Sequence, residues 1–344
     1  MPFIALILLA LLGVAHTAVQ QRPVVVITGA NSGVGLAATR QLAALNTYDV
    51  VMACRSVDRA EAARGTIPQG SGRDNVSVMR LDLADIASIQ DFCSTWGKRP
   101  INCLCLNAGV QFSDAKAAVP RTKQGFEETI GTNHLGHFLL ANLLLDNVKA
   151  AGKGRIIFTG SGVHNPSEPG GNVGSKAGLE GMRGLEEGFL DPVSMINGGP
   201  YDGDKAYKDS KLCNVATSIE LARRLQSQKS DVVSCVFNPG LIPTSGLFRG
   251  LNPLFVGIFT FLTRYVFKVA VSEEEGGDRL VTMVTSPLVS STFGGYWTAN
   301  TLADFGKLVL STPSKEAQDP EVGRRLWSLS ERVLLEAKGR MRGQ

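Results

Sequence analysis

The chain has 344 residues, of which 44% are hydrophobic and 19% are charged, a balance typical of a globular protein with material for a core. Its formal net charge of +4 is slight and unclustered, which argues against the strongly basic face of a nucleic-acid-binding protein. Six scattered cysteines without a C-x-x-C pair indicate buried free thiols rather than a disulfide framework.

Residues 1–21 form an apolar leader that we place outside the fold. Residues 3–15 are almost wholly apolar, but this run is shorter than the roughly 20 residues that a membrane-spanning helix needs. A cleaved signal peptide fits the pattern, and a retained anchor is the alternative because the basic start of a signal peptide is missing. Either interpretation predicts entry through a secretory-type membrane.

From Pro23 onward, short β-branched runs alternate with helical patterns, which predicts βαβ units and a mostly parallel sheet. Strands are expected at 24–27, 50–53, 76–81, 101–106, 155–159, 232–237 and 296–297. The clearest helical patterns cover 35–45, 125–148 and 205–226. We therefore predict a doubly wound (Rossmann) α/β fold that forms a single domain over residues 22–340.

Two stretches interrupt this alternation. Residues 165–204 are rich in Gly, Pro and Ser and form a predicted insertion, and residues 247–270 are aromatic and apolar and form a predicted lid. Long irregular segments in a compact domain are often functional, so both are candidates for the substrate pocket. The apolar stretch suits a planar apolar ligand or peripheral association with a membrane, and plain core is the alternative.

A glycine-rich loop directly follows the first strand and opens a helix. Glycines allow the backbone to turn tightly and approach a pyrophosphate, and the helix N-terminus offers free N–H groups to the phosphates. The strand–loop–helix context is the one that a dinucleotide-binding motif requires. The predicted cofactor contacts in this loop are Thr28, Gly29, Asn31, Ser32, Gly33, Val34 and Gly35.

The second and third strands end in residues that predict the form of the cofactor. Arg55, with Arg59 one turn further on, stands where an NAD enzyme is expected to carry an acid. A guanidinium suits a 2′-phosphate, so NADPH is favoured over NADH. Asp82, followed by Leu83, could accept a bond from the adenine amine, and an N-cap for the next helix is the alternative.

Tyr207 and Lys211 lie at positions i and i+4 of a predicted helix and therefore on one face. A phenol with a pKa of about 10 is a poor acid–base group at neutral pH unless a cation stabilises its phenolate. Lys211 would supply this cation and could reach a nicotinamide ribose. The spacing is common in helices, and it indicates a catalytic pair only together with the upstream glycine loop.

These motifs, with Asn107-Ala108-Gly109, Asn133 and Pro239-Gly240, resemble the short-chain dehydrogenase/reductase family from about Val24 to the C-terminal helix. Several longer strings resemble the light-dependent protochlorophyllide reductases in particular. They cover residues 132–138, 164–166, 206–214, 244–249 and 271–277.

The resemblance implies a role for each matching residue. Tyr207 would give a proton, Lys211 would lower its pKa, Asn133 would support a water-mediated proton path, and Ser161 would orient the substrate or nicotinamide. The cofactor floor would be Asn107, Ala108 and Gly109, and the nicotinamide end would be flanked by Pro239, Gly240 and Thr244. The implied substrate contacts are Cys213, Phe248 and Gln111, with simple packing as the alternative for Cys213.

The function that this resemblance implies is light-driven reduction of protochlorophyllide with NADPH, in a plastid reached through the secretory-type leader. The alternative is a dark carbonyl reductase or retinol-type dehydrogenase of the endoplasmic reticulum membrane, which the apolar leader favours. A non-enzymatic dinucleotide sensor is a third interpretation, and the intact set of Asn133, Ser161, Tyr207 and Lys211 argues against it. His134 and His137 have no further metal-ligating neighbour, so no metal is expected; an oligomer is left open.

Overall fold

The computed structural model describes residues 21–112, 119–189, 195–244, 257, 260–267, 269–299 and 307–342. The apolar leader, Phe248 and most of the predicted lid at 247–270 lie outside the described residues.

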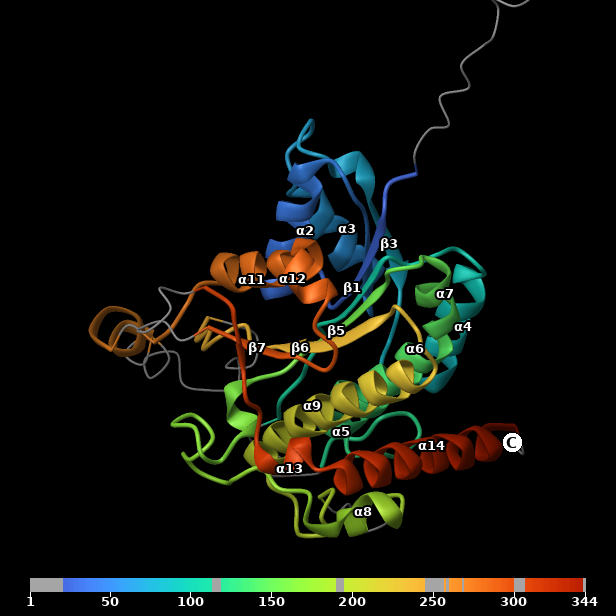
Figure 1. Cartoon of the computed structure of the whole chain (residues 1–344), viewed down its shortest axis with the longest axis vertical. Helices are drawn as coiled ribbons and strands as arrows, with labels where there is room; N and C mark the ends of the chain where they lie inside the picture. The colour runs from blue at the N-terminus through green and yellow to red at the C-terminus, as the bar shows by residue number, and fades with distance from the viewer. Residues whose placement is uncertain are drawn as a thin grey trace, which may run out of the picture.

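An eight-stranded sheet forms the centre of the molecule, in the order β3-β2-β1-β4-β5-β6-β7-β8 (Figure 1). The pairs are parallel except β7–β8, which is antiparallel. The strands are β1 (Val24–Thr28), β2 (Asp49–Cys54), β3 (Val76–Arg80), β4 (Cys103–Leu106), β5 (Arg155–Thr159), β6 (Val233–Phe237), β7 (Tyr296–Thr298) and β8 (Val309–Ser311). This arrangement confirms the predicted doubly wound fold.

Helices cover both faces of the sheet (Figure 1). On one face lie α2 (Gly33–Leu45), α3 (Val57–Gly65), α11 (Glu273–Thr285) and α12 (Pro287–Ser290). The other face carries α4 (Ile86–Trp96), α6 (His137–Leu143), α7 (Leu145–Ala150), α9 (Gly203–Ser227) and α14 (Pro320–Arg342). Shorter elements are α5 (Glu128–Ile130), α8 (Arg183–Glu186), α13 (Lys315–Gln318), and the turns Arg73–Asn75, Gly162–His164 and Glu180–Met182.

The central strands are continuous apolar runs because both of their faces are covered. All five residues of β1 and all four of β4 are buried. The direction of strand order reverses between β1 and β4, since β2 and β3 follow on one side and β5 to β8 on the other. In such sheets ligands bind outside the carboxyl ends of the strands at this switch point.

The long helix predicted over 125–148 is not continuous. A short α5 leads into the π-helix η2 (Gly131–Gly136), which α6 and α7 follow. The glycines at both ends of η2 touch other segments: a Cβ on Gly131 would lie 2.3 Å from Thr122 Cγ2, and one on Gly136 would lie 2.4 Å from Leu83 O. Tertiary contact therefore overrides the leucine-rich helical pattern. The three-residue edge strand β8 was also missed, because so short a segment carries no clear periodicity.

The insertion at 165–204 is largely irregular where it is described, with α8 as its only α-helix there. Its last two residues already belong to α9, which Asp202 caps by accepting the Asp204 and Lys205 amides with its carboxylate. Within the described ranges, none of the helices has the length and apolar character that crossing a membrane would take.

Candidate active site

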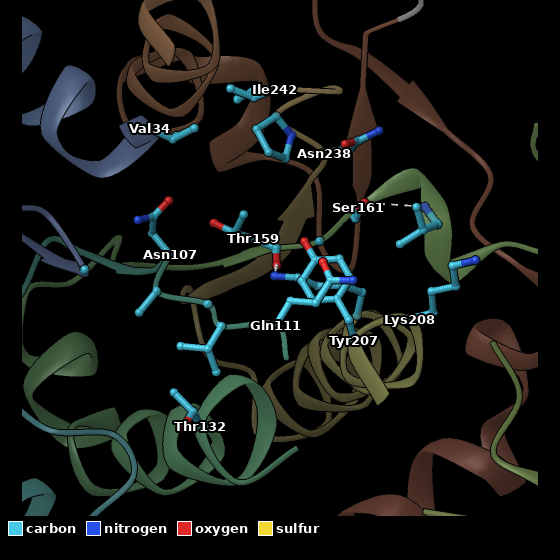
Figure 2. A pocket seen from close by; sticks show the side chains of 18 of the residues that line it. Val34, Asn107, Gln111, Thr132, Thr159, Ser161, Tyr207, Lys208, Asn238 and Ile242 are labelled. Carbon is cyan, nitrogen blue, oxygen red and sulfur yellow. Dashed lines mark hydrogen bonds between the residues drawn. The ribbon is translucent and has the colours of Figure 1, made fainter. Parts of the chain in front are cut away.

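A cavity of about 1120 Å³ opens beyond the carboxyl ends of the central strands. Figure 2 shows Val34 and Ile242 on one side of it and Tyr207 and Lys208 on the opposite side. Its wall runs from the glycine loop across the floor after β4 to the insertion, Thr263 and Val269. This volume exceeds that of a typical single-ligand pocket, so it can hold a dinucleotide and a substrate together.

The glycine loop has the close backbone packing that its residue types predicted. Gly29 has a φ of +66°, and a Cβ there would lie 3.0 Å from Ala108 Cα. A Cβ on Gly35 would lie 2.7 Å from Asn107 Nδ2. Ser32 is the N-cap residue of α2 but makes no capping bond with its side chain. The first turn of α2 therefore presents N–H groups in the manner of an anion site, which fits a pyrophosphate.

One end of the cavity is lined by Arg55, Ser56, Arg59 and Asp82. Both arginines are exposed, and Ser56 caps α3 by accepting the Arg59 amide at 3.3 Å. Asp82 accepts the Ala84 amide at 3.0 Å, and it is not the N-cap of α4. Two guanidiniums at one end fit a 2′-phosphate, which is the group that distinguishes NADPH from NADH.

Thr28 is buried beneath the floor rather than on the cavity wall. Its hydroxyl oxygen accepts the amides of Asn107 and Ala108, both at 2.9 Å. His137 lies on its other side, with Nε2 2.9 Å from that hydroxyl and Nδ1 3.0 Å from the backbone oxygen of Asn133. A carbonyl can only accept, so Nδ1 donates and Nε2 accepts the Thr28 hydroxyl proton. Burial lowers the pKa of His137 to about 3, which keeps this ring neutral.

Tyr207 and Lys211 project from α9 into the cavity, as their spacing predicted. Lys211 Nζ lies 5.4 Å from the centroid of the Tyr207 ring and donates to the backbone oxygen of Thr159 at 3.1 Å. Burial lowers the pKa of Lys211 to about 8 and raises that of Tyr207 above its usual range. The lowering expected from Lys211 does not outweigh this burial, so Tyr207 holds its proton as a neutral phenol.

Asn133 lies just beneath the floor, inside the π-helix. Its side chain accepts the Val110 amide at 2.8 Å, donates to the Val110 carbonyl at 2.9 Å and donates to Ser210 Oγ at 3.0 Å. A Cβ on Gly109 would lie 3.7 Å from Asn133 Oδ1 and 3.5 Å from Lys211 Nζ. The structure thus brings Asn133 and Lys211 close to the same side of Gly109.

Ser161 lines the cavity beyond β5 and accepts the Val163 amide at 3.4 Å. Its carbonyl accepts a hydrogen bond from His164 Nδ1 at 2.7 Å, and His164 Nε2 accepts the Ser314 amide at 3.2 Å. Burial lowers the pKa of His164 to about 4, so the neutral ring keeps this single tautomer and ties the Ser161 turn to α13.

Two of the three residues predicted to flank the nicotinamide lie on a wall of the cavity. Pro239 and Gly240 line it, together with Asn238 and Ile242, which sequence reasoning missed. Thr244 is exposed and does not lie on the lining. Asn238 accepts the Gly240 amide at 3.0 Å, and its position just before the Pro-Gly pair was the available signal.

The three residues that the resemblance implies as substrate contacts lie in different places. Gln111 lines the cavity, and Phe248 lies outside the described residues. Cys213 is fully buried within the core under the sheet and is not part of the cavity lining. Its place two residues after Lys211 turns it to another face of α9, which supports the packing interpretation.

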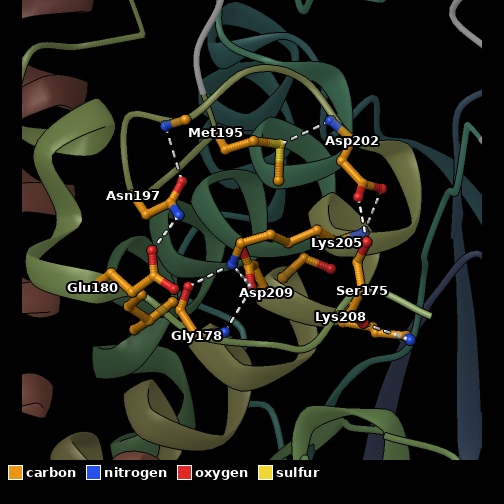
Figure 3. A network of polar contacts seen from close by, with 12 residues as sticks. Ser175, Gly178, Glu180, Met195, Asn197, Asp202, Lys205, Lys208 and Asp209 are labelled. Atoms are coloured by element: carbon orange, nitrogen blue, oxygen red, sulfur yellow. Dashed lines mark hydrogen bonds and ion pairs between the residues drawn. The ribbon is translucent and has the colours of Figure 1, made fainter. Parts of the chain in front are cut away.

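The face of α9 beside Tyr207 and Lys211 anchors the insertion (Figure 3). Lys205 Nζ donates to the Gly178 carbonyl at 2.7 Å and pairs with Asp209 at 3.0 Å, while Asp209 accepts the Gly178 amide at 3.0 Å. Lys208 donates to the backbone oxygens of Val173 and Ser175. Residues 173–178 are thus fastened to the same two helical turns that carry Tyr207 and Lys211.

The parallel sheet, the glycine loop and the helix carrying Tyr207 and Lys211 define a short-chain dehydrogenase/reductase, and the family model for short chain dehydrogenase matches residues 23–186. The chain is 41% identical over 316 residues to the chloroplastic protochlorophyllide reductase of Pisum sativum, covering 90% of this chain and 77% of that protein. Protochlorophyllide reductase A of Arabidopsis thaliana is 40% identical over 317 residues, with 90% and 76% covered. The chain therefore belongs to the protochlorophyllide reductase family, and it is an NADPH-dependent oxidoreductase.

Solved structures agree on the fold. The crystal structure of an uncharacterized protein from Mycobacterium paratuberculosis superposes with a TM-score of 0.65 at 27% identity, covering 90% of this chain and 92% of that one. A protein from Beutenbergia cavernae described as an NAD(P)-dependent gluconate 5-dehydrogenase gives 0.59 at 19% identity, with 80% and 94% covered. The latter similarity supports the fold alone.

Proposed function

We propose that this protein reduces protochlorophyllide to chlorophyllide in a light-driven reaction, with hydride from NADPH and a proton from Tyr207. The observation that carries the proposal is a neutral buried phenol beside Lys211, in a cavity large enough for a cofactor and a pigment. The similarity to protochlorophyllide reductases over 90% of the chain supports this choice of substrate. Light absorbed by the bound pigment would provide the driving force, so the protein would position the reactants and supply the proton.

The lining of the cavity would hold the cofactor through several groups. The first turn of α2 would hold the pyrophosphate, and Arg55 with Arg59 would hold the 2′-phosphate. Asn107, Ala108 and Gly109 would form the floor, with Pro239 and Gly240 at the nicotinamide end. When bound, NADPH supplies the hydride.

The side chains around Tyr207 would prepare it to act as an acid. Burial keeps its proton on the phenol, and Lys211 stabilises the negative charge that develops as the proton leaves. Thr159 holds the ammonium through its backbone oxygen. Asn133 would fix the neighbouring floor and support resupply of the proton through water, while Ser161 would orient the substrate.

We place the protein in a plastid, entered through the secretory-type leader, because the relatives are chloroplastic proteins. A peripheral association with membranes is supported by an exposed aromatic segment. Phe261, Tyr265 and Phe267 are 58%, 65% and 59% exposed. Such a patch of exposed apolar side chains suits a membrane surface or a bulky apolar partner.

Illumination of purified protein with NADPH and protochlorophyllide tests the reaction. We expect no conversion in the dark and a red shift of the pigment absorbance after a flash. If the pigment binds but illumination causes no shift, the proposed reaction is wrong. Turnover of retinal or a steroid ketone in darkness would instead identify a carbonyl reductase, the alternative that uses the same tyrosine as acid.

A further inference from the structure

Arg279 is a buried cation on the cavity wall that no sequence motif singled out. It lies in α11, is 6% exposed and lines the cavity. Its Nη1 donates to the backbone oxygen of Pro239 at 2.7 Å, and this is the one hydrogen bond that its side chain makes among the described residues. Among those residues, no carboxylate lies within ion-pair distance of its guanidinium. Burial lowers the pKa of Arg279, and the nearby Glu275 and Asp278 only partly counter this effect.

A buried arginine without a close counter-charge is costly, because removal of the cation from water is not balanced by an ion pair. One carbonyl satisfies one of the five N–H donors that a guanidinium carries. Structural anchoring of the Pro239 loop would need only a neutral donor. The remaining charge and donors therefore indicate a negatively charged group of a ligand in the cavity.

The packing of α11 places Arg279 close to the expected phosphate site. A Cβ on Gly276 would lie 2.9 Å from Val34 Cγ2 in the glycine loop and 2.8 Å from Ile242 Cδ1. A Cβ on Gly277 would lie 2.6 Å from Ala37 Cβ of α2. The two glycines thus let the backbone of α11 touch the first turns of α2. Arg279, less than one turn beyond them, meets Pro239 and Gly240 on the wall shared with the glycine loop.

We propose that Arg279 binds the pyrophosphate of NADPH, adding a side-chain cation to the backbone N–H groups of the glycine loop. This inference rests on the proposed placement of the cofactor. A pyrophosphate carries two negative charges that a guanidinium fork can bind bidentately. The residue therefore links cofactor binding to the Pro239–Gly240 wall, because one guanidinium contacts both.

Replacement by a neutral side chain of similar polarity tests the assignment. For Arg279→Gln we expect the Kd of NADPH to rise by about 10- to 100-fold, which corresponds to the usual range for charged hydrogen bonds. The Kd of adenosine 2′-monophosphate, which has the 2′-phosphate but no pyrophosphate, should not change. The dependence of NADPH affinity on salt should also become weaker, because one ionic contact is lost. Arg279→Lys should retain part of the affinity.

Arg155→Gln is the matched control. Arg155 donates to the backbone oxygens of Met283 and Val284 at the end of the same helix, away from the cavity lining. This variant should lose stability but keep NADPH affinity. The proposal is overturned if Arg279→Gln binds NADPH as tightly as the parent, or if it weakens adenosine 2′-monophosphate equally. It is also overturned if only protochlorophyllide binding weakens, since Arg279 would then serve a substrate carboxylate. Failure of the parent protein to bind NADPH would refute the proposed function itself.

Discussion

The two halves of the cavity are built from different kinds of structure. The half that we assign to the cofactor, called the cofactor half, is formed by strand ends and tight turns, where glycines let two backbone segments come into close contact. The half that we assign to the substrate, called the substrate half, is formed by the irregular insertion, which polar contacts hold to α9 (Figure 3). Tyr207 and Lys211 stand at the boundary. The first half is rigid by its backbone geometry, whereas the second depends on a few side chains.

This difference indicates which half of the cavity tolerates changes of amino-acid sequence. A side chain added at a glycine of the cofactor half would collide with neighbouring backbone atoms that cannot move aside. Steric exclusion therefore restricts which residues this half can accept. The insertion can change its shape as long as its attachments survive, and substrate choice can therefore change without loss of the reductase chemistry.

Substitution of Tyr207, at the boundary between the two halves, should have the largest effect on activity. Tyr207→Phe removes the proton donor but keeps the ring, so we expect illuminated turnover to fall by about 10²- to 10⁴-fold. NADPH affinity should stay nearly unchanged, as measured by fluorescence titration. Tyr48→Phe, which removes the hydroxyl group of a tyrosine packed on the opposite side of the sheet, should retain full activity. Equal activity of Tyr207→Phe and the parent would refute the acid role.

The charge of Lys211, at the same boundary, should make activity depend on pH, which kcat/KM measured across the alkaline range would show. Lys211 is charged below its pKa of about 8 and neutral above it. Catalysis that needs this charge should be constant at lower pH and decline as the pH rises through about 8. Tyr207 keeps its proton throughout, because burial raises its pKa. A decline only near the ordinary lysine pKa of about 10 would contradict this assignment.

In the cofactor half, Arg55→Gln should reduce the preference for NADPH over NADH by about 10- to 100-fold, because the 2′-phosphate loses a charged hydrogen-bond partner. This preference is measured as the ratio of kcat/KM with NADPH to kcat/KM with NADH. Arg64→Gln is the control, since Arg64 pairs with Glu61 at 2.9 Å away from the cavity. An unchanged preference would transfer the role to Arg59.

In the substrate half, Asp209→Asn should have the smallest effect. Asp209 is fully buried and pairs with Lys205, so the change should lower the free energy of unfolding by about 1–2 kcal/mol. Limited proteolysis within residues 165–189 should become faster, while NADPH affinity stays the same. Asp204→Asn, which removes a partly exposed partner of Lys208, should cost less. Equal costs for both would show that burial of the Asp209 pair does not hold the insertion.

The cofactor half was largely predictable from the sequence. Gly29, Arg55 and Asn107 occupy positions relative to strands that leave few alternatives, and all three line the cavity. Tyr207 and Lys211 were placed correctly because helical periodicity is a strong signal. The family assignment, the fold class and NADPH as cofactor are confirmed.

The remaining features depend on contacts between distant segments. Nothing local shows that Arg279 meets Pro239, that His137 meets Thr28, or that Thr244 is exposed. Cys213 matched a family position, yet its side chain faces the core. Motif matching identifies a residue, whereas only the packed helix shows the direction in which it points.

The π-helix Gly131–Gly136 limits how this chain can change its length. Each residue of an α-helix turns the following chain by about 100°. Loss of one residue here would restore α-helical winding and rotate His137 away from Thr28, and Asn133 would move relative to Val110. All six residues of this segment are buried, and a one-residue deletion would disconnect the floor from its support. In a gene for this protein, these six codons should therefore be free of insertions and deletions.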